Sequence, residues 1–175
     1  MNRSDVRFVA EGSLRYHRSR AEHFQFRNKY LTILGVFLGT GIVVSSVAAS
    51  HVLTTLSGVL VALINVYRLV AKPDQVAREH EDWCRKWSKL CGEVTSTAAP
   101  SPRQLKDWIV EIHDLNASCL EDMKAVKAHA YNETMASLGL RGVPYRINHW
   151  QRWTMHLFSH RHGFDDQNLE GATAA

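Results

Sequence analysis

The longest apolar stretch of the chain carries no charged side chain. Residues 30–67 contain no Asp, Glu, Lys or Arg, and His51 near their centre is the only side chain that titrates near neutral pH. A membrane-crossing helix needs about 20 apolar residues, so this stretch is nearly long enough for two. One straight helix would be roughly 57 Å long, which exceeds the thickness of the hydrocarbon core. The pattern predicts two helices, 30–48 and 52–70, joined by a turn at residues 49–51.

Two other interpretations fit parts of this stretch. In a soluble protein it would be a buried helical hairpin, but soluble core helices normally carry a polar stripe, and the rest of the chain is too small to cover both helices. A cleaved signal peptide would explain the small residues at 47–49, but the basic region before the apolar stretch is long and a second apolar segment follows. We therefore favour a transmembrane hairpin, in which both segments must be helical because lipid satisfies no backbone hydrogen bonds.

Basic residues flank the apolar stretch on both sides and are absent from the predicted turn. Arg27 and Lys29 precede the first helix, and Arg68 follows the core of the second. The positive-inside rule therefore predicts a multi-pass protein with both termini in the cytoplasm. Tyr30 and Tyr67 fall at the same inner interface, where aromatic side chains anchor membrane helices. These five residues are the predicted membrane-interface residues.

The remaining sequence alternates apolar and polar positions with helical spacing, which predicts an all-α fold. Residues 1–29 are expected to form a basic amphipathic helical arm that leads into the transmembrane hairpin at 30–70. Residues 71–163 are expected to form a C-terminal cytoplasmic helical bundle, within the chain or with neighbouring protomers. Residues 164–175 are polar and small, and we expect them to be disordered.

The first helix of the cytoplasmic part is expected to start at Pro73, because proline disfavours a helical conformation for the preceding Lys72 and is tolerated in a first helical turn. Residues 92–100 are rich in small and polar residues and predict a loop. Between these limits, apolar residues and one histidine follow a heptad pattern. They are Val76, His80, Trp83, Trp87 and Leu90.

Two further helices are expected after this loop. Ser101 is a predicted N-cap of a long helix that runs to Leu138, with Gly139 as its C-terminal cap. The last helix is expected at 145–162. Its tryptophans would either pack into the bundle or lie on an anionic membrane surface together with nearby arginines.

Small residues recur at four-residue steps in the two apolar helices, and such steps let membrane helices pack closely. This packing would occur within the hairpin or between protomers, and the sequence favours neither. The predicted packing residues are Gly35, Gly39, Gly41, Ser45, Gly58 and Ala62. A second set carries polar groups, which would line a narrow pore or bond to backbone carbonyl groups. These residues are Thr40, Ser46, Thr54, Thr55 and Asn65.

Composition adds little that favours catalysis. The chain has 175 residues, a net charge of +4, three cysteines and ten histidines. The cysteines do not form a disulfide framework and suit a reducing cytosol. His156 and His160 share a helix face and could hold a metal, but the chain is too short for the histidine boxes and spans of a membrane di-iron enzyme. We therefore predict no enzyme activity, no metal and no cofactor.

At three places the sequence resembles the SLATT family, a family of small two-transmembrane proteins associated with nucleotide-synthesising and nucleotide-sensing bacterial conflict systems. The segments are RAEHFQFRNKYLTILGVFLG at 20–39, SGVLVALINVYRLV at 57–70 and AHAYNETMASLG at 128–139. The resemblance covers about 11–162, and much of it lies in the order of basic arm, apolar hairpin and helical tail.

This resemblance implies a membrane effector in bacterial antiviral defence. Such proteins are proposed to form homo-oligomers and pores in the inner membrane, which kills or arrests an infected cell. The trigger would come from a sensor or signal-producing protein encoded nearby, or from a nucleotide signal. The alternative is an adaptor without a pore, in which the hairpin anchors a bundle that recruits a partner protein.

Overall fold

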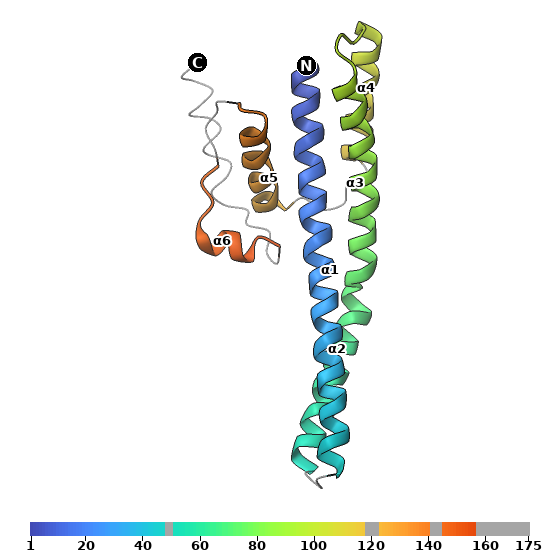
Figure 1. The fold of residues 1–175 in the computed structure, drawn as a ribbon, viewed down its shortest axis with the longest axis vertical. Coiled ribbons are helices and arrows are strands. Elements are labelled where there is room, and N and C mark those ends of the chain that lie inside the picture. Colours follow the sequence, from blue (N-terminus) through green and yellow to red (C-terminus); the bar gives the residue numbers. More distant parts are fainter. Residues whose placement is uncertain (48–50, 118–122, 141–144, 157–175) are drawn as a thin grey trace. The chain divides into compact units, whose positions relative to one another are not determined.

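The structure is a computed structural model that describes residues 1–47, 51–117, 123–140 and 145–156 (Figure 1). Within these ranges every regular element is a helix and no strand occurs, which confirms the all-α prediction. The predicted tail at 164–175 lies outside the described residues. The helices of the described part are α1 (Arg3–Val47), α2 (His51–Ala71), α3 (Pro73–Ser96), α4 (Pro102–Ala117), α5 (Lys124–Ser137) and α6 (His149–Thr154).

The chain divides into two compact units. Unit 1 consists of Met1–Arg20 and the described residues from Glu81 onward, and unit 2 consists of Ala21–His80. Helices α1 and α3 each contribute residues to both units. Unit 2 therefore contains the whole apolar stretch, whereas unit 1 contains most of the polar sequence.

The N-terminal arm is helical as predicted, because α1 begins at Arg3 and continues without a break to Val47. No proline interrupts it, and its apolar positions recur on one face. In unit 1 this face packs against α3 and α4 around a hydrophobic core. The buried members of this first core are Val6, Ala10, Trp87, Leu90, Val94, Trp108 and Ile112.

Helix α3 begins at Pro73, as predicted, but ends later than the sequence pattern indicated. The loop expected at 92–100 is wrong in its first half, since α3 runs through Gly92 to Ser96. A glycine in a helix costs about 1 kcal/mol relative to alanine, which is why it was expected to end the helix. Burial of Val94 in the first core offsets this cost and extends the helix by more than one turn.

The expectation of one long helix from 102 to 138 is also wrong. Ser101 Oγ accepts a hydrogen bond from the Gln104 backbone nitrogen at 3.2 Å, as expected for an N-cap, but α4 ends at Ala117. Met123 is extended, with φ −90° and ψ 94°, so α5 starts as a separate helix. The Tyr16 hydroxyl accepts a hydrogen bond from the Met123 backbone nitrogen at 3.3 Å, which satisfies one free N–H group at this start.

The end of α5 agrees with the prediction. Gly139 has φ +63°, a left-handed conformation that glycine adopts without steric cost. Its backbone nitrogen donates to the Ala136 oxygen at 3.3 Å, and the Leu140 nitrogen donates to the Met135 oxygen at 3.0 Å. This pair of bonds is a Schellman motif, which closes the helix by satisfying its last carbonyl groups.

The last helix is much shorter than the predicted 145–162 within the described residues. Residues 145–148 are not helical, and α6 covers only His149–Thr154. Asn148 forms a capping box with Gln151, in which the Asn148 backbone nitrogen donates to Gln151 Oε1 at 2.9 Å. Helix α6 begins directly after this cap, so Tyr145 and Ile147 precede the helix. Both side chains pack against a second core.

This second core of unit 1 connects α1, α5 and the region around α6. Small side chains dominate it, so the α5 backbone can approach its neighbours closely. Its buried members are Tyr16, Ala125, Val126, Ala128, Ala130 and Met155. Because Ile112 belongs to the first core and Val126 to the second, the two halves of the predicted long helix serve different cores.

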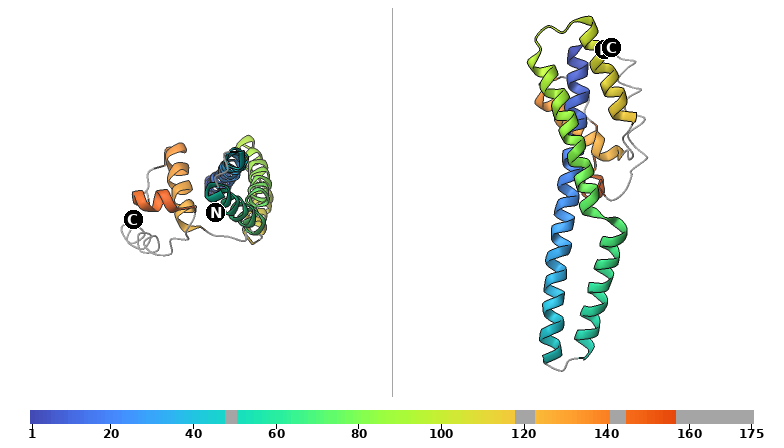
Figure 2. Two further views of the ribbon diagram at one scale, coloured as in Figure 1. Left: turned by 90° about the horizontal axis from the view of Figure 1, so that it is seen from below. Right: turned by 90° about the vertical axis from the view of Figure 1, so that its right-hand side faces the viewer.

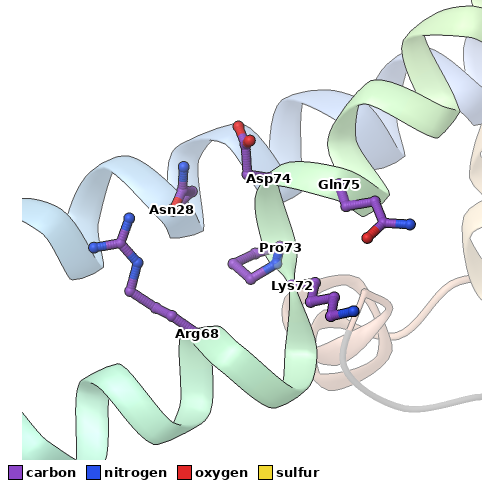
Figure 3. A pocket seen from close by; sticks show the side chains of 6 residues that line it. All are labelled: Asn28, Arg68, Lys72, Pro73, Asp74 and Gln75. Carbon is purple, nitrogen blue, oxygen red and sulfur yellow. The ribbon is translucent and has the colours of Figure 1, made fainter.

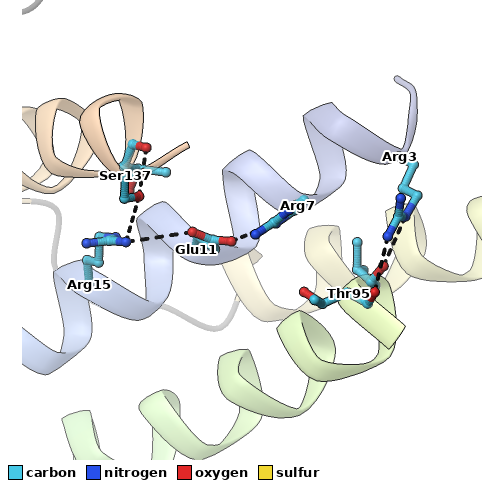
Figure 4. A network of polar contacts seen from close by, with 8 residues as sticks. Arg3, Arg7, Glu11, Arg15, Thr95 and Ser137 are labelled. Atoms are coloured by element: carbon cyan, nitrogen blue, oxygen red, sulfur yellow. Dashed lines mark hydrogen bonds and ion pairs between the residues drawn. The ribbon is translucent and has the colours of Figure 1, made fainter. Parts of the chain in front are cut away.

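Polar side chains of α1 also connect it to other helices of unit 1 (Figure 4). Arg3 donates from Nε to the Val94 oxygen at 3.1 Å and from Nη2 to the Thr95 oxygen at 3.2 Å. These bonds satisfy carbonyl groups that the end of α3 leaves free. Further along α1, Arg15 Nη2 lies 3.7 Å from Glu11 Oε2 and donates to Ser137 Oγ at 2.7 Å.

Two valine-to-alanine substitutions test the first core with identical chemistry. Val94 has no exposed surface, whereas Val110 on α4 is 49% exposed. We expect Val94→Ala to lower the free energy of unfolding by about 2 kcal/mol, because it removes buried methyl groups and leaves a cavity. Val110→Ala should change it by less than about 0.5 kcal/mol. Thermal unfolding of the purified full chain, followed by circular dichroism, would measure both; equal effects would contradict the core assignment.

Candidate functional site

The most unusual surface of the described structure is the apolar surface of residues 30–70. Helix α2 has no buried residue, although most of its side chains are apolar. Exposed side chains on both helices of unit 2 are large, with Phe37 72% and Leu63 59% exposed. Single exposed leucines are normal in soluble proteins, but a contiguous apolar surface of this length marks an interaction with a membrane or another protein.

One helical stretch among the described residues, His51–Ser96, is long and apolar enough to cross a membrane, and none of its apolar window is buried. Its apolar part is α2, which contains no acidic residue and a single basic one, Arg68. His51, which was expected in the turn, is the first residue of α2. Ala49 and Ser50, the other two expected turn residues, lie outside the described residues.

Within unit 2 the second half of α1 and helix α2 lie side by side (Figure 2). A Cβ atom at Gly41 would lie 3.7 Å from Ser57 Oγ, so these two small residues allow the helices to approach. Near the other end of α2, the Arg27 guanidinium lies over the Tyr67 ring, with its carbon 4.8 Å from the ring centroid. This cation–π contact pairs two of the predicted interface residues.

The predicted small residues separate into two groups. Gly41 faces α2, as packing within the pair of helices requires. A Cβ atom at Gly35, Gly39 or Gly58 would meet no atom within 4 Å. These three glycines therefore do not serve contacts within the described part of the chain. The side chain of Ser45, another predicted packing residue, lies outside the described residues.

One face of α2 collects several predicted residues that the sequence analysis had assigned to different roles. Thr55 and Asn65 were expected to line a pore and Gly58 and Ala62 to pack, yet steps of three, four and three residues place all four on one side of the helix. His51 extends the same face by one step of four. This spacing of four, three, four and three residues is visible in the sequence. It was missed because the small residues and the polar residues were considered as two separate sets.

Asn65 stands out on this face because it is exposed and makes no hydrogen bond with any other described residue. An amide in an apolar helix favours a partner across a helix–helix contact. Thr54, Gly58 and Val61 are half-buried, and steps of four and three residues place them along one edge of this same face. Thr54 therefore lies close to Asn65 around the helix axis.

The threonine hydroxyl groups bond to their own helices. Thr40 Oγ1 donates to the Val36 oxygen at 2.9 Å, and Thr55 Oγ1 donates to the His51 oxygen at 2.8 Å. Of the two readings of these side chains, the described geometry therefore agrees with bonding to backbone carbonyl groups. The oxygen lone pairs remain available as acceptors. The side chain of Ser46 lies outside the described residues.

The other predicted interface residues are exposed or half-exposed. Lys29 and Tyr30 are exposed on α1, and the Tyr30 ring stacks on Phe26 with centroids 6.1 Å apart. Arg68 is half-buried near the end of α2 and lines a pocket with residues of α1 and α3. This pocket includes Asn28, whose role the sequence analysis did not anticipate.

Unit 1 contains two tryptophans that the described structure does not bury. Trp150 and Trp153 on α6 are 64% and 81% exposed, and their ring centroids lie 6.4 Å apart. These two side chains are therefore not packed within the described part of the chain, whereas Thr154 and Met155 are buried. Exposed Arg152 lies between the tryptophans in sequence, which gives α6 an aromatic and basic outer face.

The candidate metal ligands of the described residues do not form a cluster. No cluster of three or more His, Cys, Asp or Glu side chains in the described ranges could hold a metal ion. Arg20 Nη1 donates to the His156 backbone oxygen at 2.9 Å, which gives this segment a structural contact. His160, the expected second ligand of a metal pair, lies outside the described residues.

The thiol of Cys91 is not activated for chemistry. Burial raises its pKa to about 11, and the nearby Glu11 carboxylate acts in the same direction. Arg7 and Arg15 lower the pKa but do not compensate. Because the thiolate is the nucleophilic form, Cys91 is a poor nucleophile at neutral pH.

Comparison of the chain with protein-family models, curated proteins and solved structures gave no match. The apolar surface, the face of α2 and the basic pocket at the end of α2 are therefore the features on which a function must be argued.

Proposed function

We propose that the chain is an oligomeric, pore-forming membrane effector that disrupts the membrane or arrests growth in bacterial antiviral defence. In this proposal, residues 30–70 cross the inner membrane as a helical hairpin, with both termini in the cytoplasm. The defence role rests on the resemblance of the sequence to the SLATT family. A sensor or signal-producing protein encoded nearby, or a nucleotide, would supply the trigger.

The observation that carries the proposal is the exposed apolar surface of residues 30–70. Each helix of unit 2 can cover only one side of the other, and the remaining apolar side chains of α2 meet no other described residue that buries them. Burial of apolar surface is favourable by roughly 25 cal/mol per Å², so leaving this surface in water would be costly. A bilayer removes that cost along both helices at once, because its hydrocarbon core is as apolar as the side chains.

Two further observations support assembly of several copies. Ala62 and Asn65 are exposed on one face of α2, a Cβ atom at Gly58 would meet no atom within 4 Å, and the asparagine amide has no partner among the described residues. Small residues permit close packing with a second copy, and the amide gains a hydrogen bond there. Since two spans cannot enclose a water path, a pore requires such an assembly.

Insertion into the bilayer can be tested with two exposed leucines. Leu63 on α2 is 59% exposed and Leu140 after α5 is 48% exposed, so neither substitution removes much burial in water. We expect Leu63→Arg to reduce membrane insertion, because arginine at the centre of a membrane helix costs about 2.5–3.5 kcal/mol on insertion scales. Leu140→Arg should have no effect. The measurement is the fraction of full-length chain that floats with membranes; wild-type chain recovered in the aqueous fraction would refute insertion.

Pore formation can be tested at Gly39. A Cβ atom at this position would meet no atom within 4 Å in the described part of the chain, so we expect the hairpin to form normally. We expect Gly39→Leu to block close packing between copies and to abolish the depolarisation caused by controlled, triggered expression of the wild-type chain. Val36→Leu, at an exposed position of the same helix, serves as the control and should retain depolarisation. An unchanged membrane potential with the wild-type chain would reject the pore.

A second candidate function is a membrane adaptor that recruits a partner protein and forms no pore. The specific observation in its favour is the outer face of α6, where Trp150 and Trp153 are exposed beside Arg152. Tryptophan and arginine dominate the binding energy of protein interfaces. The hydroxyl groups of Thr40 and Thr55 also donate to carbonyl groups of their own helices, so their hydrogen bonds are satisfied without a water-filled pore.

Exchange of the hairpin separates the two functions. Residues 30–70 would be replaced by an unrelated two-helix membrane anchor of the same length and orientation. We expect this replacement to abolish depolarisation and growth arrest, because a pore depends on the exchanged helices themselves. If the exchanged chain remains active while Trp153→Ala abolishes the activity, the adaptor function is correct instead.

A further inference from the structure

The junction between α2 and α3 has a strained backbone. Lys72 has φ 41°, and it is the only residue other than glycine with a positive φ in the described ranges. Because Pro73 follows, Lys72 is disfavoured in the right-handed helical region, so α2 cannot continue directly into α3. A lysine in the left-handed region is strained, and such strain concentrates where the surrounding structure or a ligand requires it.

The junction forms one side of a pocket of about 240 Å³ within unit 2 (Figure 3). Helix α1 contributes the other side through Asn28. In Figure 3, the Arg68 side chain extends from α2 toward the turn of α1 that carries Asn28, and Pro73 lies between Arg68 and Lys72. The pocket is lined by Asn28, Arg68, Lys72, Pro73, Asp74 and Gln75.

The pocket carries uncompensated positive charge. Neither Arg68 nor Lys72 forms an ion pair with another described residue. The one acidic side chain in the lining is Asp74, and its carboxylate already pairs with Arg78 at 2.6 Å, one turn further along α3. Figure 3 shows the Arg68 and Lys72 side chains extending in opposite directions on either side of Pro73, so Arg68 is the cation near Asn28. The only anionic group of the lining is neutralised by an ion pair with a residue outside it.

Asn28 supplies a second polar group at the same place. Its side-chain Oδ1 is buried and has no hydrogen-bond partner among the described residues. A buried acceptor without a partner is costly, and Arg68 is the donor that extends toward it (Figure 3). The amide can thus orient the guanidinium, and an oriented guanidinium binds phosphate oxygens in pairs.

We propose that this pocket binds the phosphate of an anionic phospholipid headgroup, with Arg68 as the main ligand and Asn28 as the positioning residue. This inference rests on the proposed insertion of residues 30–70 into a bilayer. A lipid is the expected source of the phosphate, because the proposed function places the end of α2 in a bilayer and exposed Leu69 and Val70 follow Arg68 directly in the sequence.

The test uses the full chain in nanodiscs that contain equal amounts of phosphatidylcholine and phosphatidylglycerol. Native mass spectrometry of the protein released from them measures which lipid stays bound. We expect wild-type chain to retain phosphatidylglycerol preferentially and Arg68→Gln to lose about tenfold of that preference, as for the loss of a charge-assisted hydrogen bond. Lys29→Gln removes one charge from the same region but does not line the pocket, so it should change the preference by less than about twofold.

Asn28→Asp is a second variant that places a negative charge beside Arg68 with almost no change of shape. We expect this variant to lose the preference for phosphatidylglycerol while the protein stays folded and inserted. It therefore still tests the pocket if the Arg68→Gln variant does not fold. Equal losses in Arg68→Gln and Lys29→Gln would overturn the pocket in favour of general surface charge. Displacement of phosphatidylglycerol by inorganic phosphate, but not by sodium chloride of equal ionic strength, would overturn the lipid assignment in favour of a soluble anion.

Flotation of the same samples separates this inference from the proposed function. Wild-type chain that does not enter membranes refutes both. Wild-type chain that enters membranes but retains the two lipids equally refutes only the pocket.

Discussion

The exposed apolar surface of α2 is the constraint on which the rest of the structure depends. A helix that is apolar on all sides must be buried in a large core or in lipid, and the chain offers no large core for it. Positions such as Thr54, Gly58, Val61 and Ile64 are only half-buried, and no residue of α2 is fully buried. Everything inferred about insertion, assembly and headgroup binding follows from the need to remove this surface from water.

The two units solve the problem of burial differently. Unit 1 buries large side chains such as Trp87, Leu90 and Trp108 among its own helices, as soluble domains do. Unit 2 holds its helices together with small residues, as the approach of Gly41 to Ser57 illustrates. Close backbone approach replaces the hydrophobic driving force where the surroundings are as apolar as the side chains.

The side chains of helix α2 differ in size and polarity from one face to another. Large side chains such as Leu63 and Val59 suit contact with lipid, whereas Gly58, Ala62 and Asn65 suit contact with another copy. At its end, Arg68 and Lys72 add a basic pocket where charged groups can meet headgroups. In the proposed function, this single apolar helix would serve anchoring, assembly and headgroup binding.

The sequence by itself determined the helical class, the position of the apolar stretch, the start of α3 at Pro73 and the glycine cap at Gly139. These features depend on local periodicity and backbone chemistry, which are readable residue by residue. Only the tertiary structure decided that α3 continues past Gly92 and that α4 and α5 are separate helices.

The physical reason is that tertiary burial outweighs local preference. Val94 gains more from the first core than Gly92 costs the helix, and residues on either side of the break near Met123 pack into different cores. The candidate site follows the same division. The spacing of residues in the sequence is enough to place Gly58 and Asn65 on one face of α2. Only the fold brings Asn28 of α1 and Arg68 of α2, forty residues apart in the sequence, to the same pocket.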